Sequence, residues 1–137
     1  MFAVLAGGSV WSGCAQNIRR EQVPSVVFNA FAQQFPEAVD IEWEKHRELY
    51  NVEFEIGKAD HELWLDDKGT FVRHEEEVEP YLLPQKVQER LRTDFAGAET
   101  DDAWRITEGN NLYYLVELES WPGDKHVRIH EDGTVAR

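Results

Sequence analysis

The sequence predicts an α+β fold in which a helix followed by four antiparallel strands occurs twice and builds one continuous sheet. Along the chain, the spacing of apolar residues changes from a helical period to the two-residue period of a strand, and this change occurs twice. The second set of motifs follows the first after about 60 residues. Because the strands alternate apolar and polar residues, we expect the helices to cover only one face of the sheet.

The internal repeat is the strongest signal in the chain. Matching residues keep their order, while their separation grows from 60 to 64, which predicts small insertions in loops. The pattern divides the chain into an export signal and linker at 1–22, a first repeat at 23–79 and a second repeat at 80–137. The main matched pairs are Val23 with Leu83, Phe31 with Leu91, Phe35 with Phe95, Trp43 with Trp104, Tyr50 with Tyr114, and Gly69 with Gly133.

Each repeat opens with a predicted amphipathic helix. In the first repeat, Val27, Phe31 and Phe35 are four residues apart and form one apolar stripe. Pro24 suits the first turn of that helix, where a backbone N–H is not needed, and Pro36 ends it. The second helix has the same design with Pro84, Val87, Leu91 and Phe95.

After each helix the alternation is typical of antiparallel strands. In the first repeat the inward residues form three sets, followed by a tight turn at Asp67-Lys68-Gly69. The same phase predicts that Trp43 and Trp104 belong to the core. The inward residues are Val39, Ile41 and Trp43, then Tyr50, Val52 and Phe54, then Leu63 and Leu65, and in the second repeat Trp104, Ile106, Tyr114, Val116, Leu118, Val127 and Ile129.

Charge excludes one class of partner and favours another. The chain has 27 acidic and 14 basic residues, so it repels a phosphate backbone and is not expected to bind nucleic acid. The excess is uneven: residues 23–79 carry 15 acidic and 5 basic side chains, whereas residues 83–137 carry 11 and 7. A cationic partner is therefore expected to prefer the first repeat. The acidic run Glu75–Glu79 is interpreted as a solvated linker between the repeats.

The amino terminus indicates export. Residues 1–13 have no charged side chain, and a small residue precedes Cys14, as in a bacterial lipoprotein cleavage site. In that interpretation Cys14 is lipidated. A secretory cleavage after Ala15 fits almost as well, and Cys14 is then removed. Both interpretations place the protein in the periplasm or cell envelope of a Gram-negative bacterium, bound to the membrane only through the lipid, if it is present. The alternative to export is an apolar segment that packs on the folded domain.

The residues that could support catalysis or metal binding are not arranged for either. His126 and His130 are four residues apart in a predicted strand, about 13 Å along it, which is too far for a shared ion. The serines lack the context of a nucleophile elbow, and a lone Cys allows no internal disulfide. The sequence therefore predicts neither an enzyme nor a cofactor, and no metal site.

A candidate binding surface lies on the outward face of the sheet. Leu63 and Leu65 must point inward, so the alternation directs Trp64 outward. An exposed aromatic ring surrounded by carboxylates would suit a partner with Lys or Arg side chains. Packing of Trp64 and Tyr113 on a neighbouring loop is the alternative. The predicted contact residues are Glu42, Glu44, Glu53, Glu55, Trp64, Tyr113 and Arg128.

These motifs resemble the PepSY-like, β-lactamase-inhibitor-protein-like domains of exported Bacteroidetes proteins. The resemblance lies in Phe35-Pro36 with Ala38, in Tyr50 to Glu55, and in Leu63 to Phe71, and it covers residues 23–137 in two copies. It implies tandem α/β repeats with an open sheet face, and it brings no catalytic residues.

Two functions follow as expectations, and a degenerate hydrolase is kept as a third hypothesis. The first is an exported, non-enzymatic domain that holds a protein or peptide with basic residues on the open sheet face. Inhibition of that partner is one form of this expectation. The alternative is an envelope module that senses a small molecule or a divalent cation. Neither the partner nor the oligomeric state follows from the sequence.

Overall fold

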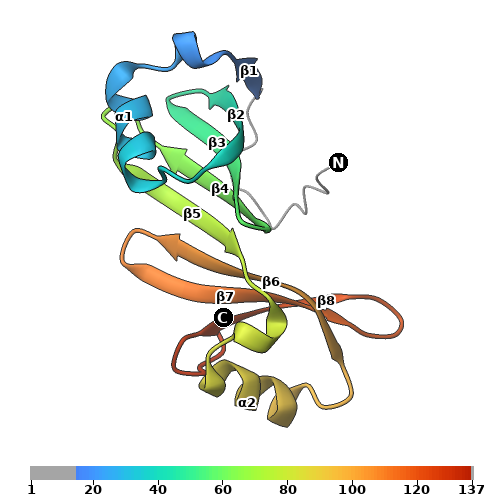
Figure 1. Cartoon of the computed structure of the whole chain (residues 1–137). Coiled ribbons are helices and arrows are strands. Elements are labelled where there is room, and N and C mark those ends of the chain that lie inside the picture. The colour runs from blue at the N-terminus through green and yellow to red at the C-terminus, as the bar shows by residue number, and fades with distance from the viewer. Residues whose placement is uncertain (1–14, 137) are drawn as a thin grey trace.

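The structure is a computed structural model that describes residues 15–136, and its main feature is a single eight-stranded antiparallel sheet. The strands lie side by side in chain order, and two α-helices pack on the sheet (Figure 1). The elements are β1 (Gln16–Ile18), η1 (Arg20–Gln22), α1 (Ser25–Gln34), β2 (Val39–His46), β3 (Leu49–Ile56), β4 (Ala59–Leu65), β5 (Phe71–Glu77), η2 (Pro80–Leu82), α2 (Gln85–Asp94), β6 (Glu99–Glu108), β7 (Asn111–Glu119) and β8 (Lys125–His130).

The same order of elements occurs twice, but its boundaries differ from the expected ones. A strand, a short 3-10 helix, an α-helix and three strands run from β1 to β4 and again from β5 to β8. Residues 16–22, expected to be linker, form β1 and η1. The acidic run at Glu75–Glu77 is not a linker either, because it forms the end of β5 and joins the two halves of the sheet. Only three strands follow α2 within residues 15–136, instead of four.

The strand register shows which residues of the two halves are equivalent. Trp43 lies opposite Val52, and Ala103 lies opposite Val116, so the counterpart of Trp43 is Ala103. The expected match of Trp43 with Trp104, and the expected packing of Trp104 and Ile106 on the helix side of the sheet, are therefore wrong, although Ile106 is fully buried on the opposite face. Shifting a strand by one residue moves its side chains to the other face, and Trp104 lies half-buried on the face away from the helices.

The growth of the offset from 60 to 64 comes from a longer hairpin. The β2–β3 hairpin ends at the pair His46–Leu49, whereas the β6–β7 hairpin continues to the pair Glu108–Asn111. The four additional residues extend both strands by two, so the inserted length is paired sheet and not a longer loop.

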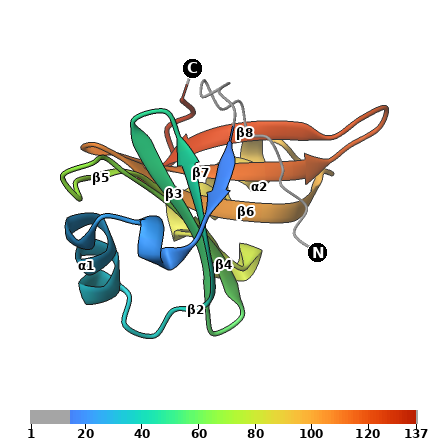
Figure 2. The same cartoon turned by 90° about the horizontal axis from the view of Figure 1, so that it is seen from above.

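The register places both helices on one face, over two apolar clusters. Each cluster joins the inward side of one helix to the inward residues of three strands, and the sheet twists so that β6–β8 cross the direction of β2–β4 (Figure 2). The first cluster is Val23, Val27, Phe31, Trp43, Tyr50, Val52, Phe54, Leu63 and Leu65. The second is Leu83, Val87, Leu91, Ala103, Tyr114, Val116, Leu118, Val127 and Ile129.

A glycine turn holds each helix close to the sheet. Gly69 has a φ of 82°, and a Cβ atom there would lie 2.9 Å from the Val26 carbonyl oxygen of α1. Gly133 has a φ of 88°, and its Cβ would lie 2.8 Å from the Lys86 carbonyl oxygen of α2. Both the left-handed backbone and the close approach require glycine, which explains why the two turns share it.

Candidate functional site

The face of the sheet opposite the helices, called the open face here, carries all seven predicted contact residues. Glu42 lies directly opposite Glu53, and Trp64 lies between Asn51 and Arg73 on the neighbouring strands. Across β7 and β8, Leu115 lies opposite Arg128, and Tyr113 shares their face. The predicted strand phase is therefore correct for these residues. Those numbered 42–64 lie in the first half of the sheet and those numbered 113–128 lie in the second.

The predicted exposure of Trp64 is wrong, because only 7% of its surface is accessible. The ring of His46 covers it from β2, with the ring centroids 4.8 Å apart. Asn51 and Arg73 flank it on either side in the sheet. Trp64 is thus the floor of the open face and not an exposed anchor. Tyr113 is similarly buried, with 8% of its surface accessible.

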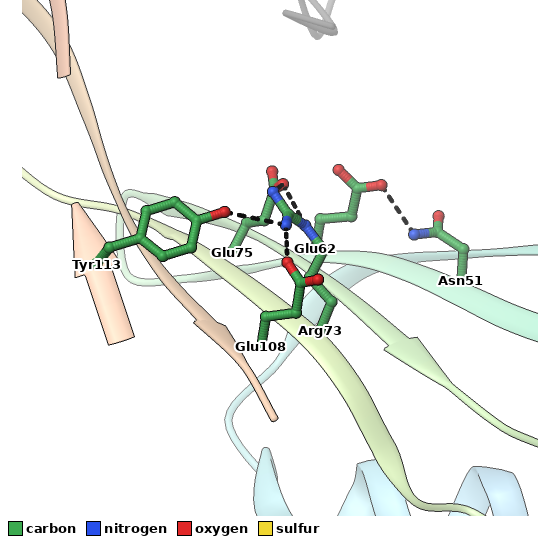
Figure 3. Close-up of polar contacts among 6 residues, drawn as sticks. All are labelled: Asn51, Glu62, Arg73, Glu75, Glu108 and Tyr113. Carbon is green, nitrogen blue, oxygen red and sulfur yellow. Dashed lines mark hydrogen bonds and ion pairs between the residues drawn. The ribbon is translucent and has the colours of Figure 1, made fainter. Parts of the chain in front are cut away.

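Arg73 organises the centre of this face (Figure 3). Its Nε donates to Glu75 at 2.9 Å and its Nη1 donates to the Tyr113 hydroxyl at 3.2 Å and to Glu108. Burial opposes the charge of Arg73, but the bonds to Glu75 and Tyr113 outweigh it and raise the pKa of the guanidinium. These bonds connect β5 with β6 and β7, so they fix the two halves to each other.

Next to this centre, carboxylates from four strands gather into what we call the acidic cluster. Partial burial and the neighbouring Glu44 and Glu42 raise the pKa of Glu53, and Asp60 adds to this effect. Partial desolvation and the nearby Asp40 and Asp60 also raise the pKa of Glu55. Like charges this close disfavour one another's ionisation. The acidic cluster consists of Glu42, Glu44, Glu53, Glu55, Asp60, Glu62, Glu75 and Glu77.

Glu62 is the most strongly perturbed member of the acidic cluster. It accepts a hydrogen bond of 2.9 Å from Asn51 Nδ2 (Figure 3). Burial, followed by the charges of Glu75 and Glu53, raises the pKa of Glu62 to about 7. A carboxyl group that titrates there could take part in proton transfer. The groups that act on its pKa are the carboxylates of Glu75 and Glu53, the Asn51 amide and the Arg73 guanidinium.

Tyr113 and Arg128 form the opposite end of the open face. The Arg128 guanidinium lies 5.6 Å from the centre of the Tyr113 ring, and Arg128 is exposed. Since Tyr113 also bonds Arg73, a continuous line of contacts joins Arg128 to the centre. Arg128 places a cationic group at this end, whereas the end around Glu53 carries carboxylates.

Sequence reasoning missed Arg73, Asn51 and Glu62. Glu62 was within reach, because it is two residues from Trp64 and so must share its face. Arg73 was not, because the pairing of β4 with β5 shifts next to Trp64 and the shift changes the phase of β5. Cys14 and the apolar segment at 1–13 lie outside the described residues. No helix in residues 15–136 is long and apolar enough to cross a membrane.

Solved structures with the same fold come from Bacteroides species. A BLIP-like protein from Bacteroides fragilis has a TM-score of 0.73 and 19% sequence identity over 83% of each chain. A protein from Bacteroides eggerthii, described as one of the "putative periplasmic proteins", has a TM-score of 0.74 and 15% identity over 84% of this chain and 86% of that chain. At these identities the likeness establishes the fold alone.

Sequence comparison gives the family. Comparison with curated proteins yields no match. A family model described as "Putative beta-lactamase-inhibitor-like, PepSY-like" matches residues 9–73 and again residues 48–136. The two matches overlap and together span most of the chain, in agreement with the repeated element order. The chain therefore belongs to the PepSY-like, beta-lactamase-inhibitor-like family.

Proposed function

We propose that this protein is an exported, non-enzymatic binding domain whose open face holds a segment of a protein or peptide rich in Lys and Arg. The acidic cluster is the contact surface, with Glu42, Glu53 and Glu55 at its accessible side. The buried Trp64 supports this surface from below and does not contact the partner directly.

One observation carries this proposal. Four carboxyl groups of the acidic cluster, namely Glu53, Glu55, Glu62 and Glu77, have pKa values raised by desolvation and by neighbouring carboxylates. Such a cluster stores electrostatic repulsion in the unbound protein. A cationic partner relieves that repulsion, and this relief contributes to binding free energy and to the rate of encounter.

The family relationship supports a binding role over catalysis. Its description names a likeness to an inhibitor, and a domain that covers a functional segment of its partner inhibits it by occlusion. Inhibition is therefore one form that this binding takes. Export fits the apolar amino-terminal segment. Cys14 is either lipidated or removed with that segment, and cell fractionation of Cys14→Ala distinguishes these outcomes.

We further infer that the two halves are copies of one unit. The pairs Leu65–Phe71 and Ile129–Val135 occupy equivalent positions, and the register shift in β2 recurs in β6. β5 belongs to both patterns, because it closes the first half and opens the second. The binding proposal concerns the first copy, whose open face has the larger share of carboxylates.

The proposal is tested with defined peptides. A Lys-rich decapeptide with an acetylated amino terminus and unmodified Lys side chains is titrated into the protein by calorimetry at two salt concentrations. A Gln-rich decapeptide of equal length is titrated in the same way. We expect salt-sensitive binding of the Lys peptide alone. The triple variant Glu42→Gln, Glu53→Gln, Glu55→Gln is expected to bind at least tenfold more weakly, because it removes three charges from the accessible side of the acidic cluster.

The control removes the same number of charges elsewhere. Glu21, Glu37 and Glu131 are exposed and lie outside the acidic cluster, in η1, after α1 and in the turn after β8. The variant with all three changed to Gln should bind within about twofold of the unmodified protein, since screening weakens distant charges. Equal weakening in both variants would mean that only net charge attracts the peptide, and the proposed surface would be wrong.

A further inference from the structure

The irregularity in β6 brings two consecutive carboxylates beside a third. Pairing between β6 and β7 is regular at Thr100–Leu118 and resumes at Ala103–Val116. Asp101 and Asp102 therefore both face the single residue Glu117 across the strands, as in a β-bulge. One carboxylate oxygen from each of the three residues lies within 4.8 Å of the others.

Glu117 supplies a second, separate observation. Only 7% of its surface is accessible, and its Oε2 atom is buried without a hydrogen-bond partner among residues 15–136. His126 Nε2 lies 3.3 Å away, at ion-pair distance, but does not form a hydrogen bond to this oxygen. A buried carboxylate oxygen that accepts no hydrogen bond is costly, so it indicates a positively charged ligand.

We propose that Asp101, Asp102 and Glu117 form a binding site for a divalent cation that prefers oxygen ligands, with Ca²⁺ as the expected ion. Calcium binds carboxylate oxygens at about 2.3–2.6 Å, so two ligands on opposite sides of one ion are up to about 5 Å apart. The observed spacing of the three oxygens falls within that limit. Three carboxylates also supply the charge that this ion requires.

The surroundings favour a hard cation over zinc. The three donors that lie within 4.8 Å of one another are all oxygens, and His126 Nε2 is not part of this group, whereas zinc sites mostly use His and Cys at shorter distances. Burial and the charge of Asp101 raise the pKa of Asp102, as expected where a cation is needed to neutralise the group. His126 is about half exposed and is free to turn away when an ion binds Glu117.

The first half provides a natural control, because it lacks the full set. The offset of 60 on β2 and 64 on β3 places Ile41, Glu42 and Glu53 at the positions of Asp101, Asp102 and Glu117. The apolar Ile41 replaces one carboxylate there. A cation that merely gathers around negative charge would depend on Glu42 and Glu53 as much as on the proposed site.

The test is calorimetric titration of the full chain with CaCl₂, together with the melting temperature. We expect one ion per chain and a rise in melting temperature, because an ion that binds only the folded state stabilises it. Asp101→Asn with Asp102→Asn should weaken binding at least tenfold. Without calcium this variant should melt at the same or a higher temperature, since it removes like charges, and this result would show that it folds.

Two further variants complete the test. Glu42→Gln with Glu53→Gln should bind calcium within twofold of the unmodified protein. His126→Gln should bind equally well or more tightly, because the imidazole lies 3.3 Å from Glu117 Oε2 and competes with the ion for that oxygen. The proposal is overturned if calcium gives no saturable signal or if the Glu42 and Glu53 variant loses as much affinity as the Asp101 and Asp102 variant. It is also overturned if His126→Gln abolishes binding, which would make the imidazole the essential ligand.

Discussion

The two halves of the molecule have the same backbone plan and fill it differently. In the first half, Phe31 packs edge-on against Trp43 and Phe54, with ring centroids 5.4 and 5.0 Å apart. The equivalent positions in the second half hold smaller side chains, and an open pocket of about 600 Å³ lies beside α2 there. The changes are Phe28 to Gln88, Phe31 to Leu91, Trp43 to Ala103 and Phe54 to Leu118.

This difference distinguishes the backbone features that define each half from the core side chains that vary between the halves. The glycine turns, the register shifts and the helix positions are shared, although the volumes of the core residues are not. Backbone geometry therefore defines each half, and a core with fewer large side chains can still satisfy it. The open face differs as well, since Trp64 in the first half corresponds to the exposed Arg128 in the second.

The largest expected change in the free energy of unfolding comes from substitutions at Trp64 and Arg128, the equivalent positions on the open face. Trp64→Ala should lower the free energy of unfolding by about 3–5 kcal/mol, as for other buried Trp side chains. Arg128→Ala should cost less than about 1 kcal/mol, because Arg128 is exposed and its side chain rests on the Tyr113 ring. Urea unfolding of both variants measures the two values. A small loss for Trp64→Ala would mean that its ring is exposed.

Glu62→Gln should change the free energy of unfolding by an amount that depends on pH. The pKa of Glu62 rises from 4.5 to about 7 on folding, so the folded state holds the proton more tightly. Its contribution to stability is complete below about pH 4.5 and is lost as the pH rises toward 7. The variant stays neutral and keeps the bond from Asn51, so it should be more stable than the unmodified protein at pH 8, by up to about 3 kcal/mol.

The comparison with Glu62→Gln is made across pH values. At pH 4.5 the two proteins should have nearly equal unfolding free energies. Burial lowers the pKa of His74 to about 4, with His61 adding to this, so its effect on stability has the opposite sign. His74 is present in both proteins, so its effect cancels in the difference. A difference that does not change with pH would show that Glu62 is ionised normally.

A reciprocal exchange between the cores should give the smallest effect. Phe31→Leu should cost about 1–2 kcal/mol, because Phe31 is 1% exposed and touches three aromatic rings. Leu91→Phe should change stability by less than about 1 kcal/mol, since Leu91 lines the open pocket and a larger ring has room. Chemical unfolding compares the two, and equal losses would contradict the difference in packing.

Much of the fold followed from the sequence because both periodicities are strong. The apolar stripes of α1 and α2 and the alternation in β3 and β7 predicted the helices and the inward residues. The match of Trp43 with Trp104 was wrong because the β6–β7 hairpin is four residues longer than the β2–β3 hairpin. The pattern of aromatic residues does not show at which point of the sequence these residues are inserted. Trp43 and Trp104 look equivalent by residue type, whereas the strand register makes Ala103 the position equivalent to Trp43.

The candidate site was less predictable, because exposure depends on neighbours that are distant in sequence. Alternation placed Trp64 on the correct face, but only the pairing of β2 with β3 brings His46 over its ring. The site of Asp101, Asp102 and Glu117 depends on a bulge, which breaks the very alternation used to predict faces.

The central claim is that the acidic cluster of the first half binds a cationic partner. Titration of ¹⁵N-labelled protein with the Lys-rich decapeptide tests it most directly, by following the backbone amide signals. We expect shifts concentrated in β2, β3 and β4, including the amides of Glu53 and Glu55, that saturate and disappear at high salt. Shifts confined to the second half, or none in β2–β4 at saturating peptide, would contradict the claim.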